Sequence, residues 1–242
     1  NYNTATSRQY TDLAIFTVNE SIGEDARYFF DSVLKGIVPT AFRTLVSAPG
    51  KLHRRVLSHI ESEIRAAEAG KPARIFVKVT ALVEKSVIAS LYRASQAGVK
   101  VDLVVRGACS LIPGVKGLSE NIRVISLIDR FLEHSRIYYF QNSRVVYLSS
   151  ADWMQRNFFS RVELAFPVLD ERIYRYIEET VIPAYLADTA KAKELTPQGT
   201  WKKRPTQHGK TVMRAQFFFE DLAASGYTGT SLESRLSGFA QS

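Results

Sequence analysis

A histidine and an arginine lie two residues apart near the middle of the chain, at His134 and Arg136. Side chains alternate along a strand, so both would lie on the same face of one. An imidazole can carry a proton or act as a nucleophile near neutral pH, and a guanidinium offers forked donors to phosphoryl oxygens. The pair therefore predicts a phosphate site. The motif is only three residues long, so a structural or surface histidine is the alternative.

Two further cations lie within or at the end of expected strands. Arg106 follows the apolar run 99–105 and precedes Gly107. Open α/β sheets bind ligands beyond the carboxyl ends of their strands, so this arginine is a candidate anion contact, with an ion pair to a nearby carboxylate as the alternative. Lys78 interrupts the apolar run 74–79, so we expect it either at a sheet edge or pointing into a cleft.

Hydroxyl and carboxylate groups follow another expected strand, at 145–148. Ser150 lies in the segment Ser149-Ser150-Ala151-Asp152, whose hydroxyl and N–H groups could meet an anion. Alternatively, Ser150 or Asp152 caps a helix that begins near Trp153. Glu163 lies within an apolar strand, where its carboxylate needs an arginine or a histidine as a partner.

Other kinds of site are disfavoured by the sequence. The single cysteine excludes a disulfide framework, and four scattered histidines exclude a classical zinc site. His53 and His59 lie six residues apart on one expected helix, which places them on opposite faces. The chain has no P-loop and no G-x-G-x-x-G motif. No apolar run reaches the roughly 18–20 residues of a membrane span, and no secretory signal is seen, so the default compartment is the cytoplasm.

The elements that must position these groups are typical of an α/β domain. Apolar residues at helical spacing predict helices at 21–38, 51–69, 83–97, 171–186 and 213–224. Runs rich in β-branched residues predict strands at 74–79, 99–105, 122–127, 136–140, 145–148 and 162–168. The order strand, helix, strand over 74–105 is a βαβ unit, which builds buried parallel strands.

The composition fits a globular protein with an anionic partner. The 242 residues include 45% apolar residues and carry a net charge of +8. A surplus of this size favours partners such as nucleotide, polyphosphate, nucleic acid or a membrane surface. From 195 to 219 the chain has five Lys or Arg and no acid.

Longer motifs carry a more specific signal than any of these residues alone. They include VRGACSLIPG at 105–114, DRFLEHSRI at 129–137 and YLSSADWM at 147–154, with shorter matches at 1–3, 10–12, 94–99 and 121–124. Together they resemble the bacterial polyphosphate kinases, which make polyphosphate from ATP. The resemblance extends from Asn1 to about Phe219.

The resemblance implies a phospholipase D-like α/β fold, a mixed sheet flanked by helices, used twice in a pseudo-twofold pair. It implies that residues 1–47 end the first catalytic half and that 48–224 form the second. The Ser- and Gly-rich residues 225–242 are expected to form a flexible tail. Arg136 replaces that superfamily's usual lysine, Gln141 replaces its aspartate, and Asp152 stands where it has asparagine. These departures favour phosphoryl transfer over phospholipase or nuclease activity.

The resemblance also implies a reaction and its residues. The ATP γ-phosphate would move reversibly to polyphosphate through a phosphohistidine on an upstream histidine outside this chain. Tyr10 and Arg106 match ATP and phosphate contacts, and His134 matches a second essential, catalytic histidine at the ATP phosphates. Glu163 would orient a histidine across the pair. We add three supporting phosphate contacts, at Lys78, Arg136 and Ser150. No metal ligands are expected in this chain, since Mg2+ would arrive with ATP and meet arginines upstream.

The expected partners are ATP, ADP and polyphosphate, with no nucleic acid. The full-length protein is expected to be a homo-oligomer, peripheral membrane association is left open, and the isolated chain is expected to be inactive. Two alternatives stay open. One is a phospholipase D-like phosphodiesterase, and the other is an anion-binding module in which the basic run 195–219 grips polyphosphate or nucleic acid.

Overall fold

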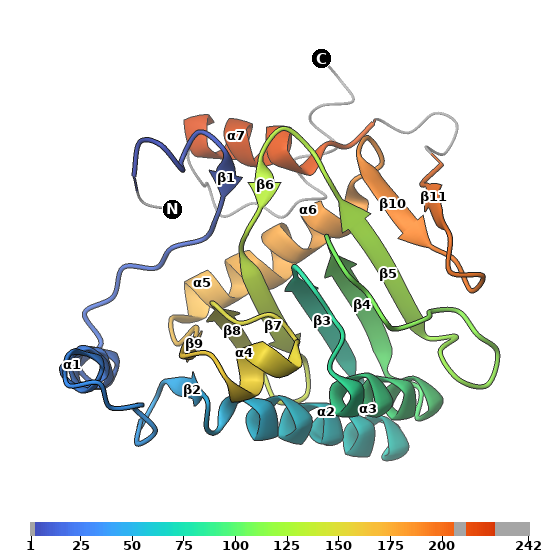
Figure 1. The fold of residues 1–242 in the computed structure, drawn as a ribbon. Coiled ribbons are helices and arrows are strands. Elements are labelled where there is room, and N and C mark those ends of the chain that lie inside the picture. The colour runs from blue at the N-terminus through green and yellow to red at the C-terminus, as the bar shows by residue number, and fades with distance from the viewer. Residues whose placement is uncertain (1–2, 206–211, 226–242) are drawn as a thin grey trace.

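A nine-stranded mixed sheet forms the centre of the molecule in the computed structural model, which describes residues 3–205 and 212–225 (Figure 1). Its strand order is β11-β10-β5-β4-β3-β7-β8-β9-β2. The strands are β2 (Val46–Ala48), β3 (Arg74–Val79), β4 (Lys100–Val105), β5 (Ile122–Leu127), β7 (Arg136–Phe140), β8 (Val145–Ser149), β9 (Glu163–Pro167), β10 (Ala192–Leu195) and β11 (Trp201–Lys203). β3, β4 and β5 run parallel, and β7 pairs antiparallel with β3.

The predicted mixed sheet flanked by helices is confirmed, and so is the βαβ unit. The unit consists of β3, α3 (Lys85–Gln96) and β4. The sequence prediction missed the short strands β2, β10 and β11. It also missed a separate two-stranded parallel ribbon, in which β1 (Tyr10–Thr11) pairs with β6 (Leu132–Glu133). These strands are two to four residues long, too short to show a clear alternation of apolar residues.

Helices cover both faces of the sheet, and the side chains of β3 alternate between them. Ile75, Val77 and Val79 share a core with apolar residues of α2 (Leu52–Glu68) and α3. Phe76 faces the opposite layer, a long helix built from α5 (Glu171–Tyr176), a π-helical turn (Ile177–Val181) and α6 (Ile182–Ala187). The predicted helix 171–186 is thus confirmed, with the π turn just before Pro183, whose missing N–H cannot join an ordinary helical ladder.

Two helices lie at the ends of the described chain. α1 (Glu20–Leu34) begins at Asn19, whose side chain accepts a hydrogen bond from the N–H of Ile22. α7 (Ala215–Ser225) lies near β6 and β1 at the top of Figure 1. α1 ends four residues earlier than predicted, and the short α4 (Gln155–Phe159) follows β8.

The expected tail lies outside the described residues beyond Ser225. No helix among the described residues is long and apolar enough to span a membrane.

Candidate functional site

The candidate site lies at one end of the central strands β3, β4, β7 and β8. Thr80 and Arg106 directly follow β3 and β4, which are parallel and therefore end on the same side. β7 is antiparallel to β3, so its first residue, Arg136, lies on that side too. Arg136 is paired in register with Ser149, the last residue of β8. The topology thus brings together residues that are up to 70 positions apart in the sequence.

Both ring nitrogens of His134 contact side chains of the described residues. Its Nδ1 lies 2.9 Å from Oδ2 of Asp12, and its Nε2 lies 3.0 Å from Nη1 of Arg136. A guanidinium can only donate, so Nε2 is the acceptor and Nδ1 carries the proton that Asp12 accepts. The contacts therefore select one neutral tautomer, with an acceptor nitrogen directed toward Arg136. The side chain of His134 is 36% exposed, which leaves it accessible.

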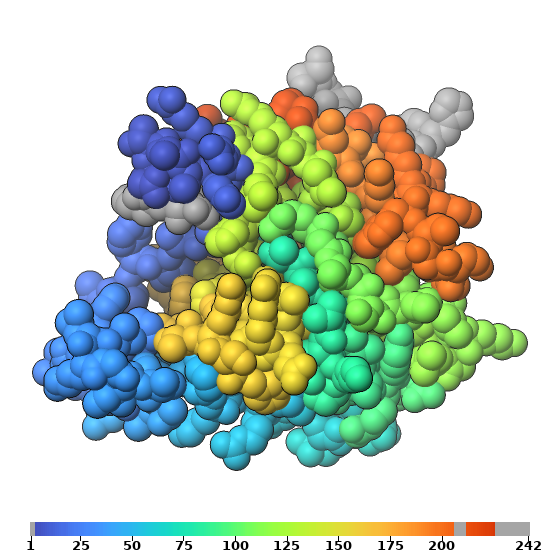
Figure 2. Space-filling view, in the orientation of Figure 1, coloured from blue at the N-terminus to red at the C-terminus, as the bar shows by residue number. Residues whose placement is uncertain are grey.

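The N-terminal segment provides two groups around this histidine. The backbone N–H of His134 donates to the carbonyl of Thr11 at 3.0 Å, which fixes β1 beside β6. The Tyr10 ring packs edge-on against the imidazole, with ring centroids 5.4 Å apart. Figure 2 shows this segment, in dark blue, against the green loop that leads to His134. Tyr10 was predicted for the site, whereas Asp12 was missed, although it follows Tyr10 within the same matched motif.

Arg136 forms a buried, two-pronged ion pair with Asp152. Its Nε and Nη2 lie 3.1 Å and 3.2 Å from the two carboxylate oxygens. The side chains are only 11% and 9% exposed. Asp152 also accepts the backbone N–H of Thr80 at 2.7 Å. Neither Asp152 nor Ser150 caps α4, which begins after Met154 without a side-chain cap, so the expected capping role is wrong.

Arg106 is held in place without a carboxylate partner. Its Nε donates to the carbonyl of Glu133 at 3.0 Å and its Nη2 to the hydroxyl of Thr80 at 3.1 Å. Among the described residues it forms no ion pair with an acid. Burial, and then the nearby charge of Arg136, lower the pKa of Arg106 from its ordinary value, so an added negative charge here would be stabilised.

Gly107 allows the chain after β4 to approach β3 closely. Its N–H donates to the carbonyl oxygen of Thr80 at 2.7 Å, and a Cβ on Gly107 would lie 3.0 Å from that same oxygen. The hydroxyl of Thr80 receives hydrogen bonds from both Arg106 and Arg136. The glycine therefore sets the spacing on which both arginine contacts depend.

Ser150 and Glu163 are hydrogen-bonded to each other beside a small pocket that His134 and Arg136 also line. The Ser150 hydroxyl donates to Glu163 at 2.5 Å, and the Asn157 amide donates to its other oxygen at 2.6 Å. Within the described residues Glu163 is thus bound by a hydroxyl and an amide, and its expected role in orienting a histidine across the pair stays a prediction. Ser150 helps line this pocket of about 190 Å³, together with His134, Arg136, Asp12, Leu13, Ser135, Leu148, Ser149 and Phe166.

Lys78 does not reach this pocket. It belongs to a central strand and is only 2% exposed, so the expectation of an edge or cleft position is wrong. Alternation along β3 turns it toward α6, where its ammonium donates to the carbonyl and hydroxyl of Ser135, each at 2.9 Å. It also pairs with Glu133 at 3.1 Å. Its predicted phosphate contact has no support in this arrangement.

The described residues offer no ligand set for a metal ion. They contain no group of three or more His, Cys, Asp or Glu side chains that could hold one. Asp12, Asp152 and Glu163, the acids around the pocket, each already bind a side chain. The chemistry of this donor set does not fit a protein-held Mg2+.

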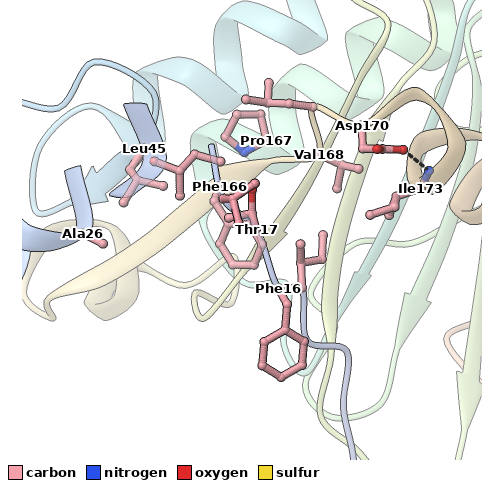
Figure 3. Close-up of a pocket in the computed structure, with 13 residues that line it drawn as sticks. Phe16, Thr17, Ala26, Leu45, Phe166, Pro167, Val168, Asp170 and Ile173 are labelled. Carbon is pink, nitrogen blue, oxygen red and sulfur yellow. Dashed lines mark hydrogen bonds between the residues drawn. The ribbon is translucent and has the colours of Figure 1, made fainter. Parts of the chain in front are cut away.

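A second, apolar pocket of about 380 Å³ adjoins the first through Phe166 (Figure 3). It is formed by the segment 15–18, α1, the end of β9 and the start of α5. Its acid, Asp170, caps α5 by accepting the N–H groups of Arg172 and Ile173. Since its lining is mostly apolar, we assign the phosphate chemistry to the first pocket.

Comparisons with known proteins agree on one family. A family model described as "Polyphosphate kinase C-terminal domain 2" matches residues 45–216. The chain is 47% identical over 218 residues to the polyphosphate kinase of Burkholderia cenocepacia, covering 89% of this chain and 31% of that protein. It is 46% identical to the polyphosphate kinase of Xylella fastidiosa over 206 residues, covering 84% of this chain and 29% of that protein.

A solved structure agrees in fold over most of the chain. The crystal structure of polyphosphate kinase from Porphyromonas gingivalis superposes with a TM-score of 0.86 at 37% identity. The match covers 93% of this chain and 35% of that one. The present chain thus spans about a third of the length of the proteins it matches.

Proposed function

Because this chain belongs to the polyphosphate kinase family, we propose that it supplies one side of an active site that transfers the ATP γ-phosphate reversibly to inorganic polyphosphate. The acceptor histidine that carries the phosphoryl group between the two substrates would lie outside this chain. A covalent intermediate divides a difficult transfer between two polyanions into two easier displacements. ATP, ADP and polyphosphate are then the substrates of the full-length enzyme.

The observation that carries this proposal is that Arg106, which is bonded to the carbonyl of Glu133 next to His134, forms no ion pair with an acid in the described part of the chain. Arg136 lies in the same cluster, but Asp152 already neutralises it. Arg106 is oriented by a carbonyl and a hydroxyl and forms no ion pair with an acid of the described residues, so its charge stays available to phosphoryl oxygens. Arg136 then serves to fix His134, and Arg106 to bind phosphate.

His134 would act as a proton carrier or as a stabiliser of the transition state. If a bound phosphoryl group drew Nη1 of Arg136 away from Nε2, this nitrogen could take up a proton, and the resulting imidazolium would stay paired with Asp12 at Nδ1. The imidazolium would then present an N–H donor where negative charge develops during transfer. Tyr10 limits the ring's orientation from its edge. Glu163 would act indirectly, by orienting Ser150 at the pocket wall.

Other features of the full-length protein stay part of the proposal. Mg2+ would arrive bound to the nucleotide, as the resemblance to the family implies. The resemblance to the family supports a homo-oligomer in the cytoplasm, and it supports a paired arrangement of two similar catalytic halves.

The test is ATP-dependent polyphosphate synthesis by the full-length protein carrying His134→Ala. We expect the rate to fall by about 10²–10⁴-fold, the usual contribution of a general acid or base. The matched control is His53→Gln, which changes a histidine that contacts Glu84 and Ser86 away from the site. Near-normal synthesis by His134→Ala would overturn the proposal. Polyphosphate binding that survives this change and weakens with salt, without any synthesis by the unaltered protein, would indicate an anion-binding module instead.

A further inference from the structure

A buried polar cluster surrounds the carboxylate of Glu133, the residue that precedes His134. The carboxylate of Glu133 is only 2% exposed and receives three donors from three separate elements. The ammonium of Lys78 lies 3.1 Å from it, the Tyr185 hydroxyl 3.0 Å, and the Gln216 amide 2.7 Å. These donors come from β3, α6 and α7. A buried carboxylate with this many partners is held in one place, since leaving any of them unpaired is costly.

Both chain neighbours of His134 are tied to this cluster. Lys78 binds Glu133 on one side of the histidine and the carbonyl and hydroxyl of Ser135 on the other. The carbonyl of Glu133 accepts Nε of Arg106, so the phosphate-binding arginine is anchored to the same residue. The imidazole is accessible, whereas the backbone that carries it is fixed from within the core.

α7 completes the cluster through one side chain. The Gln216 amide accepts the N–H of Phe131 at 2.9 Å and donates to the carbonyl of Phe131 at 2.8 Å, in addition to its bond with Glu133. Gln216 is 4% exposed. Two residues before Gln216, just ahead of the start of α7, Arg214 donates two hydrogen bonds to Asp129, at 2.8 Å and 2.6 Å. The loop that leads to His134 is therefore bound by Gln216 of α7 and by the residue that precedes this helix.

We infer that Gln216, together with the Lys78–Glu133 pair, is a positioning residue for His134, and that α7 is part of the catalytic machinery without touching substrate. The inference rests on the proposed function. β1 and the residue before it hold the backbone N–H groups of Leu132 and His134, whereas Gln216 holds the backbone of Phe131 and the carboxylate of Glu133. Displacing a catalytic group by about 1 Å can cost on the order of 100-fold in rate, so loosening either set of contacts would lower turnover.

The test uses full-length enzyme with Gln216→Leu, which keeps the approximate size of the side chain but removes its hydrogen bonds. We expect kcat to fall by about 10–100-fold while KM for ATP changes less than about twofold, because only a transition-state contact is lost. Tyr185→Phe removes a single donor from Glu133 and should give a smaller loss of the same kind. The matched control is Gln96→Leu, the same change at an exposed residue of α3 whose amide donates to the carbonyl of Gly117, and it should retain full activity.

A double variant separates positioning from general structural damage. If Gln216 acts through His134, adding Gln216→Leu to His134→Ala should slow single-turnover phosphoryl transfer no further. A loss that multiplies with that of His134→Ala would overturn the inference, as would a normal kcat in Gln216→Leu. Those results leave the proposed function intact if His134→Ala is itself inactive. Near-normal activity of His134→Ala would overturn the proposed function and the inference together.

Discussion

The Asp152→Asn variant tests how much the Arg136–Asp152 ion pair contributes to the free energy of unfolding. Asp152 and Arg136 are bidentate, with side chains 9% and 11% exposed, so water screens the pair little. Removing one partner of a buried ion pair typically costs about 3–5 kcal/mol, because the remaining charge stays desolvated. The amide can still accept hydrogen bonds from Thr80 and Arg136, so we expect a smaller loss of about 2–3 kcal/mol.

Urea unfolding at pH 7 measures this loss, with thermal unfolding as a second readout. For a chain of this length, a loss of that size corresponds to a fall in Tm of roughly 5–10 °C. The matched control is Asp170→Asn, which makes the same chemical change at an exposed pair with Arg172 and keeps a good helix cap. It should leave the urea midpoint and Tm unchanged within experimental error. A loss equally small for Asp152→Asn would refute the reasoning.

Three further changes have expected outcomes. Gly107→Ala places a methyl group 3.0 Å from the Thr80 carbonyl, so it should lower stability by about 1–3 kcal/mol in urea unfolding and reduce activity; unchanged values would contradict this. Arg106→Gln should raise KM for ATP about tenfold in steady-state kinetics of the full-length enzyme, and a KM within twofold of normal would show that Arg106 does not bind phosphate. Burial, and then Arg55, lower the pKa of His59 to about 4, so the folded state resists protonation. The contribution of His59 to the free energy of unfolding should therefore be complete above pH 6.5 and be lost as the pH falls toward 4. In His59→Gln this part of the pH dependence should disappear. A pH profile of stability identical to that of the unaltered protein would exclude His59 as its source.

The central sheet could be predicted from the sequence because its strands are long and apolar. The runs around β3, β4 and β5 are each six residues of mostly β-branched or aliphatic side chains, and α3 connects the first two with clear helical periodicity. The site's general location followed as well, since Arg106 ends a parallel strand. His134 was singled out by its spacing from Arg136 and then by motif resemblance, Tyr10 by resemblance alone, and the structure brings their rings into contact.

The partners of these residues could not be predicted, because they depend on contacts between distant segments. Asp12 meets His134 across 122 positions, through a β1–β6 ribbon of only two residues per strand. Gln216 meets Glu133 across 83 positions. The role of Lys78 was misjudged for a similar reason. The residues next to Lys78 in the sequence do not indicate that its charge is neutralised by Glu133, a buried residue of another strand.

The central claim is that His134 acts on the phosphoryl group as it leaves ATP. The most direct measurement is single-turnover transfer of the labelled γ-phosphate from saturating ATP to full-length enzyme, followed by rapid quench, for the unaltered protein and for His134→Ala. We predict that labelling of the His134→Ala protein is slower by at least about 100-fold, while its circular dichroism and ATP affinity stay close to normal. A labelling rate within twofold of that of the unaltered protein would contradict the account.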